Sequence, residues 1–341
     1  MAHKLAVPTS HVDRYARQEI LPQVGADGQK KLRDARILVV GAGGLGCPAL
    51  QYLAGAGIGT LIVVDGDCVD ASNLHRQPLY GEASLAQAKA QAAAAFVKNL
   101  NPQVKVIAHT TVVTPANVDA LLAEVDVALD CADSFAATYI LSDACLDKGI
   151  ALIAASALGL TGYAGGFCAS APSVRAVFPD LPKDLATCAT AGVLGPLVGM
   201  LGAMQAQMAL SVLLRLTPSP LGQLVTLNAQ SYRFGGFRFD GAAEPRHAAF
   251  SFIAATDITA TDLVIELRGI DEAPQAVVPD AVRATVQAFE DQAVQTSAQH
   301  RTVLCCRSGL RAWRAAAALN QYSETPIALL AMGDEPSLSS R

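Results

Sequence analysis

A short apolar run followed at once by closely spaced glycines is the feature that most limits how this chain can fold. Residues 36–40 are Arg-Ile-Leu-Val-Val, and residues 41–46 are Gly-Ala-Gly-Gly-Leu-Gly. The first run is typical of a buried strand, and an apolar pattern at helical spacing follows over 47–56. Glycines between a strand and a helix permit a tight turn and let backbone N–H groups approach phosphate oxygens at the helix N-terminus. The pattern predicts a nucleotide site, with a plain strand-to-helix turn as the alternative, and leaves NAD and ATP both open.

Up to Ala155 the sequence alternates between short apolar runs and helical patterns. Such alternation predicts a mostly parallel sheet with right-handed crossovers, and all-apolar strands are expected where helices cover both faces. We therefore predict an α/β protein with a Rossmann-like sheet, extended by antiparallel strands at 224–228 and 232–239. The expected parallel strands are 36–40, 60–64, 104–109, 125–130 and 150–155, and the expected helices are 47–56, 83–100, 115–124 and 138–148.

The composition fits such a sheet but also raises the question of a membrane protein. Apolar residues make up 52% of the 341, and charged residues only 16%. The longest uncharged run, 185–214, exceeds the roughly 20 residues that span a bilayer. It also contains Gln205 and Gln207, and Gly195-Pro196 interrupts it. We expect a buried core helix here and no membrane partner.

Charge and cysteine content narrow the class further. The chain has 25 basic and 30 acidic residues and a net charge of -5, so no bulk basic surface is available for nucleic acid. The N-terminal residues 1–11 show no signal-peptide pattern, and none of the eight cysteines forms a Cys-x-x-Cys pair. We expect a cytoplasmic protein with free thiols.

Polar side chains gather where two of the expected strands end. Asp65 follows the strand 60–64 and opens a polar loop that runs to residue 77, and Asp130-x-x-Asp133 follows another strand. Ligands of open parallel sheets bind at these strand ends. Arg76 and Lys89 would offset phosphate charge, and Asp133 would hold Mg²⁺. Lys89 taken alone is more typical of a solvated helix surface. Around a glycine loop, these residue types predict phosphoryl or nucleotidyl transfer.

In this arrangement the chain resembles the MoeB/ThiF/HesA adenylating enzymes, which are relatives of the ubiquitin-activating enzymes. The resemblance covers about residues 10–240, and its separate motifs occur in the family's order. They are Arg14-Tyr15-x-Arg17-Gln18, the glycine loop 41–46, Asp65-x-Asp67, Ser72-Asn73-Leu74-x-Arg76-Gln77, Lys89-Ala90, Asp130-x-x-Asp133 and Cys188-x-x-Ala191-Gly192-Val193-Leu194-Gly195-Pro196.

The resemblance implies an activity. The C-terminal glycine carboxylate of a small ubiquitin-like sulfur carrier protein, of the MoaD or ThiS type, would attack the α-phosphate of ATP. The products would be an acyl-adenylate and pyrophosphate, and Arg76, Lys89 and Asp133 would be catalytic. Arg14 would act in trans, on the ATP of the second subunit of a homodimer. ATP and Mg²⁺ would be held by Gly41, Gly43, Gly44, Gly46, Asp65, Asp67, Ser72, Asn73, Arg76, Lys89, Asp133 and Ser134.

Two departures from the family pattern concern the nucleotide site and a metal. The family usually has Asp-Asn-x-x-x-Arg where this chain has Asp133-Ser134-x-x-x-Thr138, so an amide and a guanidinium are replaced. Family members also commonly bind zinc through two Cys-x-x-Cys pairs. These would fall near 173–176 and within 232–246, where there is no cysteine, so we expect no structural zinc.

Cys188 opens an expected helix, and a helix N-terminus lowers a thiol's pKa. In the resembling enzymes a cysteine here can bond covalently to the carrier or to a sulfur donor. We predict a catalytic role for Cys188, with a buried inert cysteine as the alternative.

After residue 240 the strand and helix patterns restart. We expect a domain over 1–240, a linker over 241–254 and a smaller α/β domain over 255–341. In that domain Cys306-x-x-Gly309-x-Arg311 has the spacing of a rhodanese active loop, which it resembles. Loop N–H groups, a helix N-terminus and arginines would stabilise a thiolate or persulfide on Cys306. The Gly-His-Ile segment usual in that fold is not apparent, so a degenerate structural domain is the alternative. The expected strands are 263–267, 302–306 and 326–330, and the expected helices 282–298 and 310–319.

Our main hypothesis is an ATP-dependent adenylyltransferase that acts on a ubiquitin-like sulfur carrier, followed by sulfur transfer from Cys306 to give a thiocarboxylate. A persulfide sulfur donor would then be a further partner. The alternatives are an NAD-dependent oxidoreductase and a non-catalytic ATP-binding homologue. The sequence leaves open whether the pathway is molybdopterin, thiamine or cysteine synthesis or tRNA thiolation.

Overall fold

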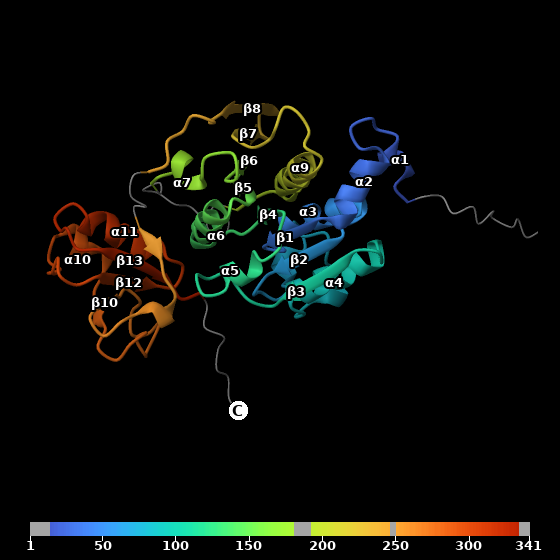
Figure 1. The fold of residues 1–341 in the computed structure, drawn as a ribbon. Helices are drawn as coiled ribbons and strands as arrows, with labels where there is room; N and C mark the ends of the chain where they lie inside the picture. Colours follow the sequence, from blue (N-terminus) through green and yellow to red (C-terminus); the bar gives the residue numbers. More distant parts are fainter. Residues whose placement is uncertain (1–13, 181–191, 246–249, 334–341) are drawn as a thin grey trace, which may run out of the picture.

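The computed structural model describes residues 14–180, 192–245 and 250–333 (Figure 1). Within them the chain forms an eight-stranded sheet in the order β3-β2-β1-β4-β5-β6-β7-β8 and a five-stranded sheet in the order β11-β10-β12-β13-β9. The large sheet consists of β1 (Arg36–Val40), β2 (Thr60–Val64), β3 (Lys105–His109), β4 (Val127–Asp130), β5 (Ala151–Leu158), β6 (Thr161–Phe167), β7 (Gln223–Asn228) and β8 (Arg233–Arg238). The predicted α/β fold class is confirmed.

The first five strands of the large sheet run parallel, and the strand order reverses at β1. Val40, the last residue of β1, lies opposite Val64 of β2 on one side and Asp130 of β4 on the other. From β5 onward the pairs are antiparallel. Crossovers therefore leave in opposite directions from β1 and β4, and a crevice opens at the carboxyl ends of these two strands.

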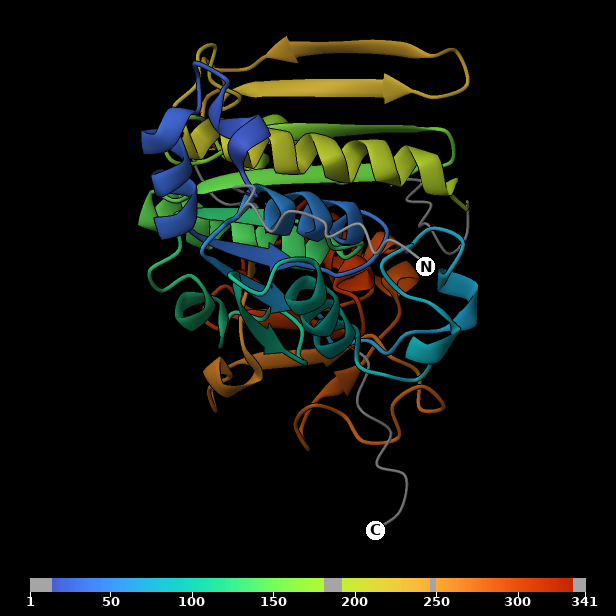
Figure 2. The ribbon, with the colours of Figure 1, turned by 90° about the vertical axis from the view of Figure 1, so that its right-hand side faces the viewer.

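Helices cover both faces of the large sheet, which explains its all-apolar strands. Alternate residues of β1 enter two different cores, Ile37 and Val39 on one face and Leu38 and Val40 on the other. Figures 1 and 2 show the first face covered by α3, α4 and α9 and the second by α5, α6 and α7. The helices are α1 (Ala16–Glu19), α2 (Gly25–Asp34), α3 (Gly46–Ala56), α4 (Lys89–Leu100), α5 (Val118–Leu121), α6 (Phe135–Lys148), α7 (Val174–Val177) and α9 (Gly195–Leu213).

The long apolar run forms α9, which is buried on one side only rather than all round as expected. By length and composition it is the one helix of the described residues that could cross a membrane. It packs beside α3, with Leu197 and Leu201 in the core and Met200 42% exposed. Gln205 is fully buried and donates to the carbonyl oxygens of Asp130 (2.7 Å) and Ile153 (3.2 Å). The polar residue inside the run thus ties the helix to two neighbouring strands of the sheet, β4 and β5.

The smaller sheet is parallel throughout and packs against the α6 face of the larger one. Its strand pairs are all parallel. Trp313 lies between the two units, with ring centroids 5.1 Å from Tyr139 and 6.2 Å from Phe135, so one apolar core runs across the contact. The unit comprises β9 (Ser251–Phe252), β10 (Leu263–Glu266), β11 (Val282–Arg283), α10 (Val286–Glu290), β12 (Thr302–Cys306), α11 (Leu310–Leu319) and β13 (Ile327–Ala331).

Several stretches differ from the sequence expectations, among them β6, which was not expected, and α5, which is shorter than expected; in three others tertiary pairing explains the difference. The helix expected over 83–100 begins only at Lys89, because Ala88 pairs with Cys68 in an isolated bridge and holds the preceding residues against the polar loop. The helix expected over 282–298 is the short strand β11 followed by the five-residue α10. The segment 241–254, expected to be a linker, contains β9, which pairs with β13 and so belongs to the second sheet. In each case tertiary pairing overrides local helix propensity or polarity.

Candidate nucleotide site

The glycine loop connects β1 to α3 and depends on glycine at two positions. Gly41 has φ +92°, and a Cβ there would lie 2.6 Å from the carbonyl oxygen of Cys131. A Cβ on Gly46 would overlap the Gly41 carbonyl oxygen. The loop therefore lies close to the end of β4, and its backbone stays open at the N-terminus of α3.

Asp65 fixes this loop from the end of β2. One carboxylate oxygen accepts the Ala42 N–H at 2.7 Å, and the other accepts the Asp67 N–H at 2.8 Å. Burial raises the pKa of Asp65, and these two hydrogen bonds oppose the rise. The structure thus brings Asp65 to the predicted place, where it also orders the loop.

Lys89 is the first residue of α4 and is buried, not solvated. Its ammonium donates to Asp67 at 2.8 Å, and its exposed fraction is 6%. Asp67 is largely exposed. The pair places a desolvated cation beside the polar loop, where a phosphate would compete with the Asp67 carboxylate for it.

Ser72 and Asn73 lie on a short 3-10 turn in the polar loop, η1 (Ala71–Asn73), and Arg76 follows three residues after it. Asp70 caps the turn by accepting from the Ser72 N–H at 2.8 Å and from its hydroxyl at 2.6 Å. The Arg76 guanidinium donates to the Ser72 carbonyl at 3.0 Å, and the residue is half-buried. The polar loop therefore holds a guanidinium and the Asn73 amide in one ordered, partly exposed segment.

Sequence reasoning missed two supporting residues. The Tyr80 hydroxyl is buried and donates to the Ala42 carbonyl at 2.8 Å, which links the glycine loop to the segment before α4. Gln77 is 3% exposed, and its Oε1 has no hydrogen-bond partner within the described residues. Its amide nitrogen lies near Gly43. Arg76 and Gln77 both belong to the family motif, but the sequence analysis assigned a function in nucleotide binding only to Arg76.

The end of β4 holds Asp130 buried and Asp133 exposed. Asp130 accepts from the Thr138 hydroxyl at 2.5 Å and from the Ala132 N–H at 3.2 Å. Burial raises its pKa to about 6. Ser134 caps α6 by accepting the Ala137 N–H at 3.5 Å. Both residues that depart from the family pattern, Ser134 and Thr138, therefore serve the local structure of α6 and β4.

Arg14 lies away from this crevice within its own subunit, where its guanidinium donates to the Leu100 carbonyl at 2.9 Å. Its predicted role in trans stays a prediction. Cys188 lies outside the described residues, and its predicted role stays a prediction as well.

Polar contacts occupy the positions where family members would have zinc-binding cysteines. Ser173 donates its N–H and its hydroxyl to Glu244, both at 2.6 Å, which joins the two segments concerned. Two residues on, Arg175 forms a bidentate ion pair with Asp143 at 2.6 and 2.8 Å. These contacts hold α7 to the segment after β8 and to α6.

Cys306 ends β12 and is fully buried, in the loop whose pattern predicts a stabilised thiolate or persulfide. Its sulfur accepts the Ala312 N–H at 3.3 Å. Burial raises its pKa, while the loop N–H groups and Arg311 act in the opposite direction. A Cβ on Gly309 would lie 2.8 Å from Phe252 and 3.3 Å from Ala136, so β9 and α6 cover the loop.

An open parallel sheet with a glycine loop, an acidic group on the next strand and basic groups at its switch point defines a nucleotide-binding protein of the doubly wound class. Residues 15–247 match the profile of the ThiF family, and the chain belongs to that family.

Several proteins resemble the chain in sequence. A SAMP-activating enzyme E1 of Haloferax volcanii is 40% identical over 232 residues, 67% of this chain and 86% of that protein. The adenylyltransferase and sulfurtransferase uba4 of Emericella nidulans is 44% identical over 59% of this chain and 44% of its own length. The adenylyltransferase and sulfurtransferase MOCS3 of Bos taurus is 43% identical over 66% of this chain and 50% of its own length. The chain spans about half the length of the first curated relatives it matches.

Solved structures support the fold. Escherichia coli MccB crystallised with ATP aligns with a TM-score of 0.58 at 18% identity, over 67% of this chain and 72% of that one. PaaA aligns with a TM-score of 0.58 at 23% identity, over 70% of this chain and 76% of the PaaA chain.

Proposed function

We propose that this chain uses ATP to adenylate the C-terminal carboxylate of a small ubiquitin-like carrier protein. The observation that carries the proposal is the crevice at the ends of β1, β2 and β4. There the glycine loop, the Lys89–Asp67 pair, Arg76 and Asp133 meet at one edge of the sheet. Membership of the ThiF family and the names of its activating-enzyme relatives support the same chemistry.

The residues of the crevice would have different roles in binding and reaction, according to their charge. Loop N–H groups at the start of α3 would bind phosphate oxygens, since a helix N-terminus favours anions. Lys89 and Arg76 would offset the negative charge that develops on the α-phosphate as the carboxylate attacks it. Asp67 would orient Lys89 until the phosphates replace it as the partner. The half-buried guanidinium of Arg76 donates to the Ser72 carbonyl oxygen, a neutral partner that competes less with a phosphate than a carboxylate would.

The donor set fits a phosphate-bound Mg²⁺. The ion usually takes one or two carboxylates, with phosphates and waters as its remaining ligands. Asp133 is an exposed carboxylate at the switch point, whereas Asp130 is buried with both oxygens already accepting hydrogen bonds. Asp133 is therefore the residue that would hold the ion. When bound, Mg²⁺ would neutralise phosphate charge.

We also propose a sulfur step at Cys306. A persulfide on its sulfur, formed by transfer of sulfane sulfur from a persulfide donor, would attack the acyl-adenylate, release AMP and leave an acyl disulfide. A thiol that attacks the Cys306 sulfur would then release the thiocarboxylate and leave a mixed disulfide, and a second thiol would reduce that disulfide and regenerate Cys306. The position of the cysteine at the end of β12, before the N-terminus of α11, supports this role. Its complete burial requires that β9 or α6 move before the sulfur can react.

ATP–pyrophosphate exchange tests the adenylation step. Full-length protein, MgATP, labelled pyrophosphate and a candidate carrier ending in Gly-Gly should give exchange that depends on the carrier. Arg76→Ala should lower the exchange rate by about 100-fold or more, because it removes a charge that stabilises the transition state. ATP binding without exchange would contradict the proposal and favour a non-catalytic homologue. Reduction of NAD by a substrate would favour an oxidoreductase.

A further inference from the structure

The Arg76 guanidinium has a second neighbour besides the Ser72 carbonyl oxygen. Its Nη1 lies 2.9 Å from Nε2 of His75, the residue before it, and 3.0 Å from the Ser72 oxygen. A guanidinium nitrogen carries only donors, so the His75 Nε2 must accept, and the proton of the neutral imidazole then lies on Nδ1. Both N–H bonds of Nη1 are therefore taken by neutral acceptors within the polar loop.

The other edge of the guanidinium remains available to a ligand. Nε and Nη2 of Arg76 form no hydrogen bond within residues 14–180, 192–245 and 250–333. These two groups form a planar fork whose N–H bonds match two oxygens of one phosphate. Because Nη1 is held by two acceptors, the rotation of this plane is restricted before any ligand binds.

The backbone that carries His75 and Arg76 lies between the glycine loop and α9. A Cβ on Gly44 would lie 3.6 Å from the Arg76 carbonyl oxygen, and a Cβ on Gly195, the first residue of α9, would lie 2.6 Å from that of His75. The Arg76 N–H also donates to the Asn73 carbonyl at 3.1 Å. The side chain therefore starts beside the glycine loop, where phosphates would bind.

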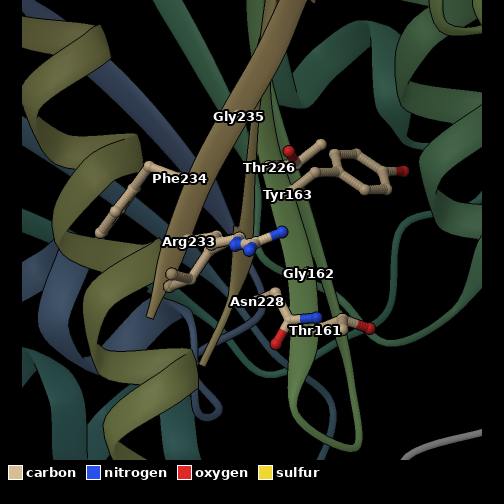
Figure 3. Close-up of a pocket in the computed structure, with 9 residues that line it drawn as sticks. Thr161, Gly162, Tyr163, Thr226, Asn228, Arg233, Phe234 and Gly235 are labelled. Atoms are coloured by element: carbon tan, nitrogen blue, oxygen red, sulfur yellow. The ribbon is translucent and has the colours of Figure 1, made fainter. Parts of the chain in front are cut away.

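Arg233 on β8 shows how an arginine lies without such contacts. Figure 3 shows it beside a groove over β6, β7 and β8, and β8 is five strands away from β1. It is exposed, and its guanidinium has no ion pair or hydrogen bond in the part of the chain that the structure describes. Such a side chain loses much of its rotamer freedom when a ligand fixes it. For Arg76, part of that freedom is already lost before binding.

We propose that His75 is a positioning residue for Arg76, which by accepting from Nη1 directs the Nε–Nη2 fork toward an ATP phosphate beside Gly44. This rests on the proposed function, because it takes the phosphates of ATP to bind at the glycine loop. His75 acts only through the guanidinium. Its neutral ring supplies an acceptor without the negative charge of a carboxylate, which would compete with the phosphate as Asp67 would at Lys89.

MgATP binding to the full-length protein, measured by calorimetry, tests this contact through a double-mutant cycle. His75→Leu removes the acceptor and should weaken binding about fivefold, because Arg76 must then be ordered by the ligand. Arg76→Ala should weaken binding about tenfold or more. In the Arg76→Ala background, His75→Leu should change the affinity by less than about twofold, since the group that it orients is gone. A merely structural role of His75 would give the same loss in both backgrounds.

Three further variants serve as controls. His75→Gln supplies a side-chain acceptor of similar reach and should stay within about twofold of the wild-type affinity. His300→Leu makes the same change at an exposed histidine of the smaller unit, and Arg233→Ala removes an arginine at the far end of the large sheet; both should leave MgATP binding unchanged. Unchanged thermal unfolding of each variant shows that the fold is intact.

The outcomes separate this proposal from the activity. Equal losses from His75→Leu in both backgrounds, no loss in either, or a loss that His75→Gln shares would overturn the positioning role. Pyrophosphate exchange by the wild type reports on adenylation alone. Coupling between His75 and Arg76 in MgATP binding without any exchange would contradict the proposed function and leave the positioning role standing. A wild-type protein that binds no MgATP would overturn both.

Discussion

Asp130 is a buried acidic group beside the candidate site. Its carboxyl group is 1% exposed at the end of β4. Burial raises its pKa from 3.8 to about 6, against hydrogen bonds from Thr138 and Ala132 that lower it. In the resembling enzymes position 138 is an arginine, whereas here it supplies only a hydroxyl. The buried carboxylate therefore lacks the cation that the family pattern would give it.

Because of this pKa shift, the free energy of unfolding should decrease as the pH rises. A raised folded-state pKa means that the folded protein binds the proton more tightly than the unfolded chain does. The resulting stabilisation is complete below pH 3.8 and is lost as the pH rises through about 6. Two pKa units correspond to about 3 kcal/mol, so ionised Asp130 costs the fold roughly that amount at pH 8.

Asp130→Asn should remove this cost. Its amide oxygen can still accept the Ala132 N–H, and its amide nitrogen can donate to the Thr138 hydroxyl. In urea unfolding, the gain over wild type should be near zero at pH 4 and rise to about 2–3 kcal/mol at pH 8. Asp147→Asn, at an exposed position of α6, is the matched control and should change stability by less than about 0.5 kcal/mol throughout.

Thr138→Val tests the same reasoning from the other partner. It removes a hydrogen bond that favours the ionised carboxylate, so it should destabilise the protein by about 1–3 kcal/mol at pH 8 and by less at pH 4. An Asp130→Asn gain that does not vary with pH, or a loss of stability at pH 8, would refute the account of a buried, strained carboxylate.

The remaining predictions concern other parts of the chain. Asp67→Asn should raise the KM for ATP only a few-fold, whereas Lys89→Ala should lower the exchange rate by at least about 100-fold, as measured by pyrophosphate exchange; equal effects would contradict their separate roles. Cys306→Ala should abolish thiosulfate turnover and spare adenylation, and parallel loss of both activities would count against separate sites. We predict no bound zinc, and elemental analysis that finds one zinc per chain would overturn that prediction. Glu244→Gln should lower the unfolding temperature, because it weakens the contact with Ser173. We predict a homodimer, and sedimentation that shows only monomer at micromolar concentration would contradict it.

The sequence predicted the first half of the large sheet well because its signals are local. β1, β2, β12 and α11 have the predicted bounds, since each is a short apolar or amphipathic run next to glycine or a turn. The helix expected from residue 83 failed because Ala-rich segments favour a helix only where no tertiary contact competes. Here the bridge between Cys68 and Ala88 competes and delays α4 to Lys89.

The candidate site was predictable in its parts but not in its pairings. Strand ends placed Asp65 and Asp133 at one edge of the sheet, because parallel strands end together. Nothing local shows that Lys89 is buried against Asp67, or that Tyr80 bonds the glycine loop, since both depend on how α4 packs. Likewise a strand-to-helix loop indicates a helix N-terminus at Cys306, but not the covering of that loop by Ala136 and Phe252.

That covering restricts how the two proposed steps can be combined. Ala136 lies beside the Cys306 loop, where a Cβ on Gly309 would be 3.3 Å away, and it is three residues after Asp133, on the first turn of α6. A displacement of this turn that uncovered Cys306 would also move the carboxylate that would hold magnesium. A displacement of β9 alone would uncover the loop from the Phe252 side and leave Asp133 in place. Because Phe252 meets Gly309 and β9 is only two residues long, sulfur transfer compatible with an assembled nucleotide site would have to proceed through the β9 side of the loop.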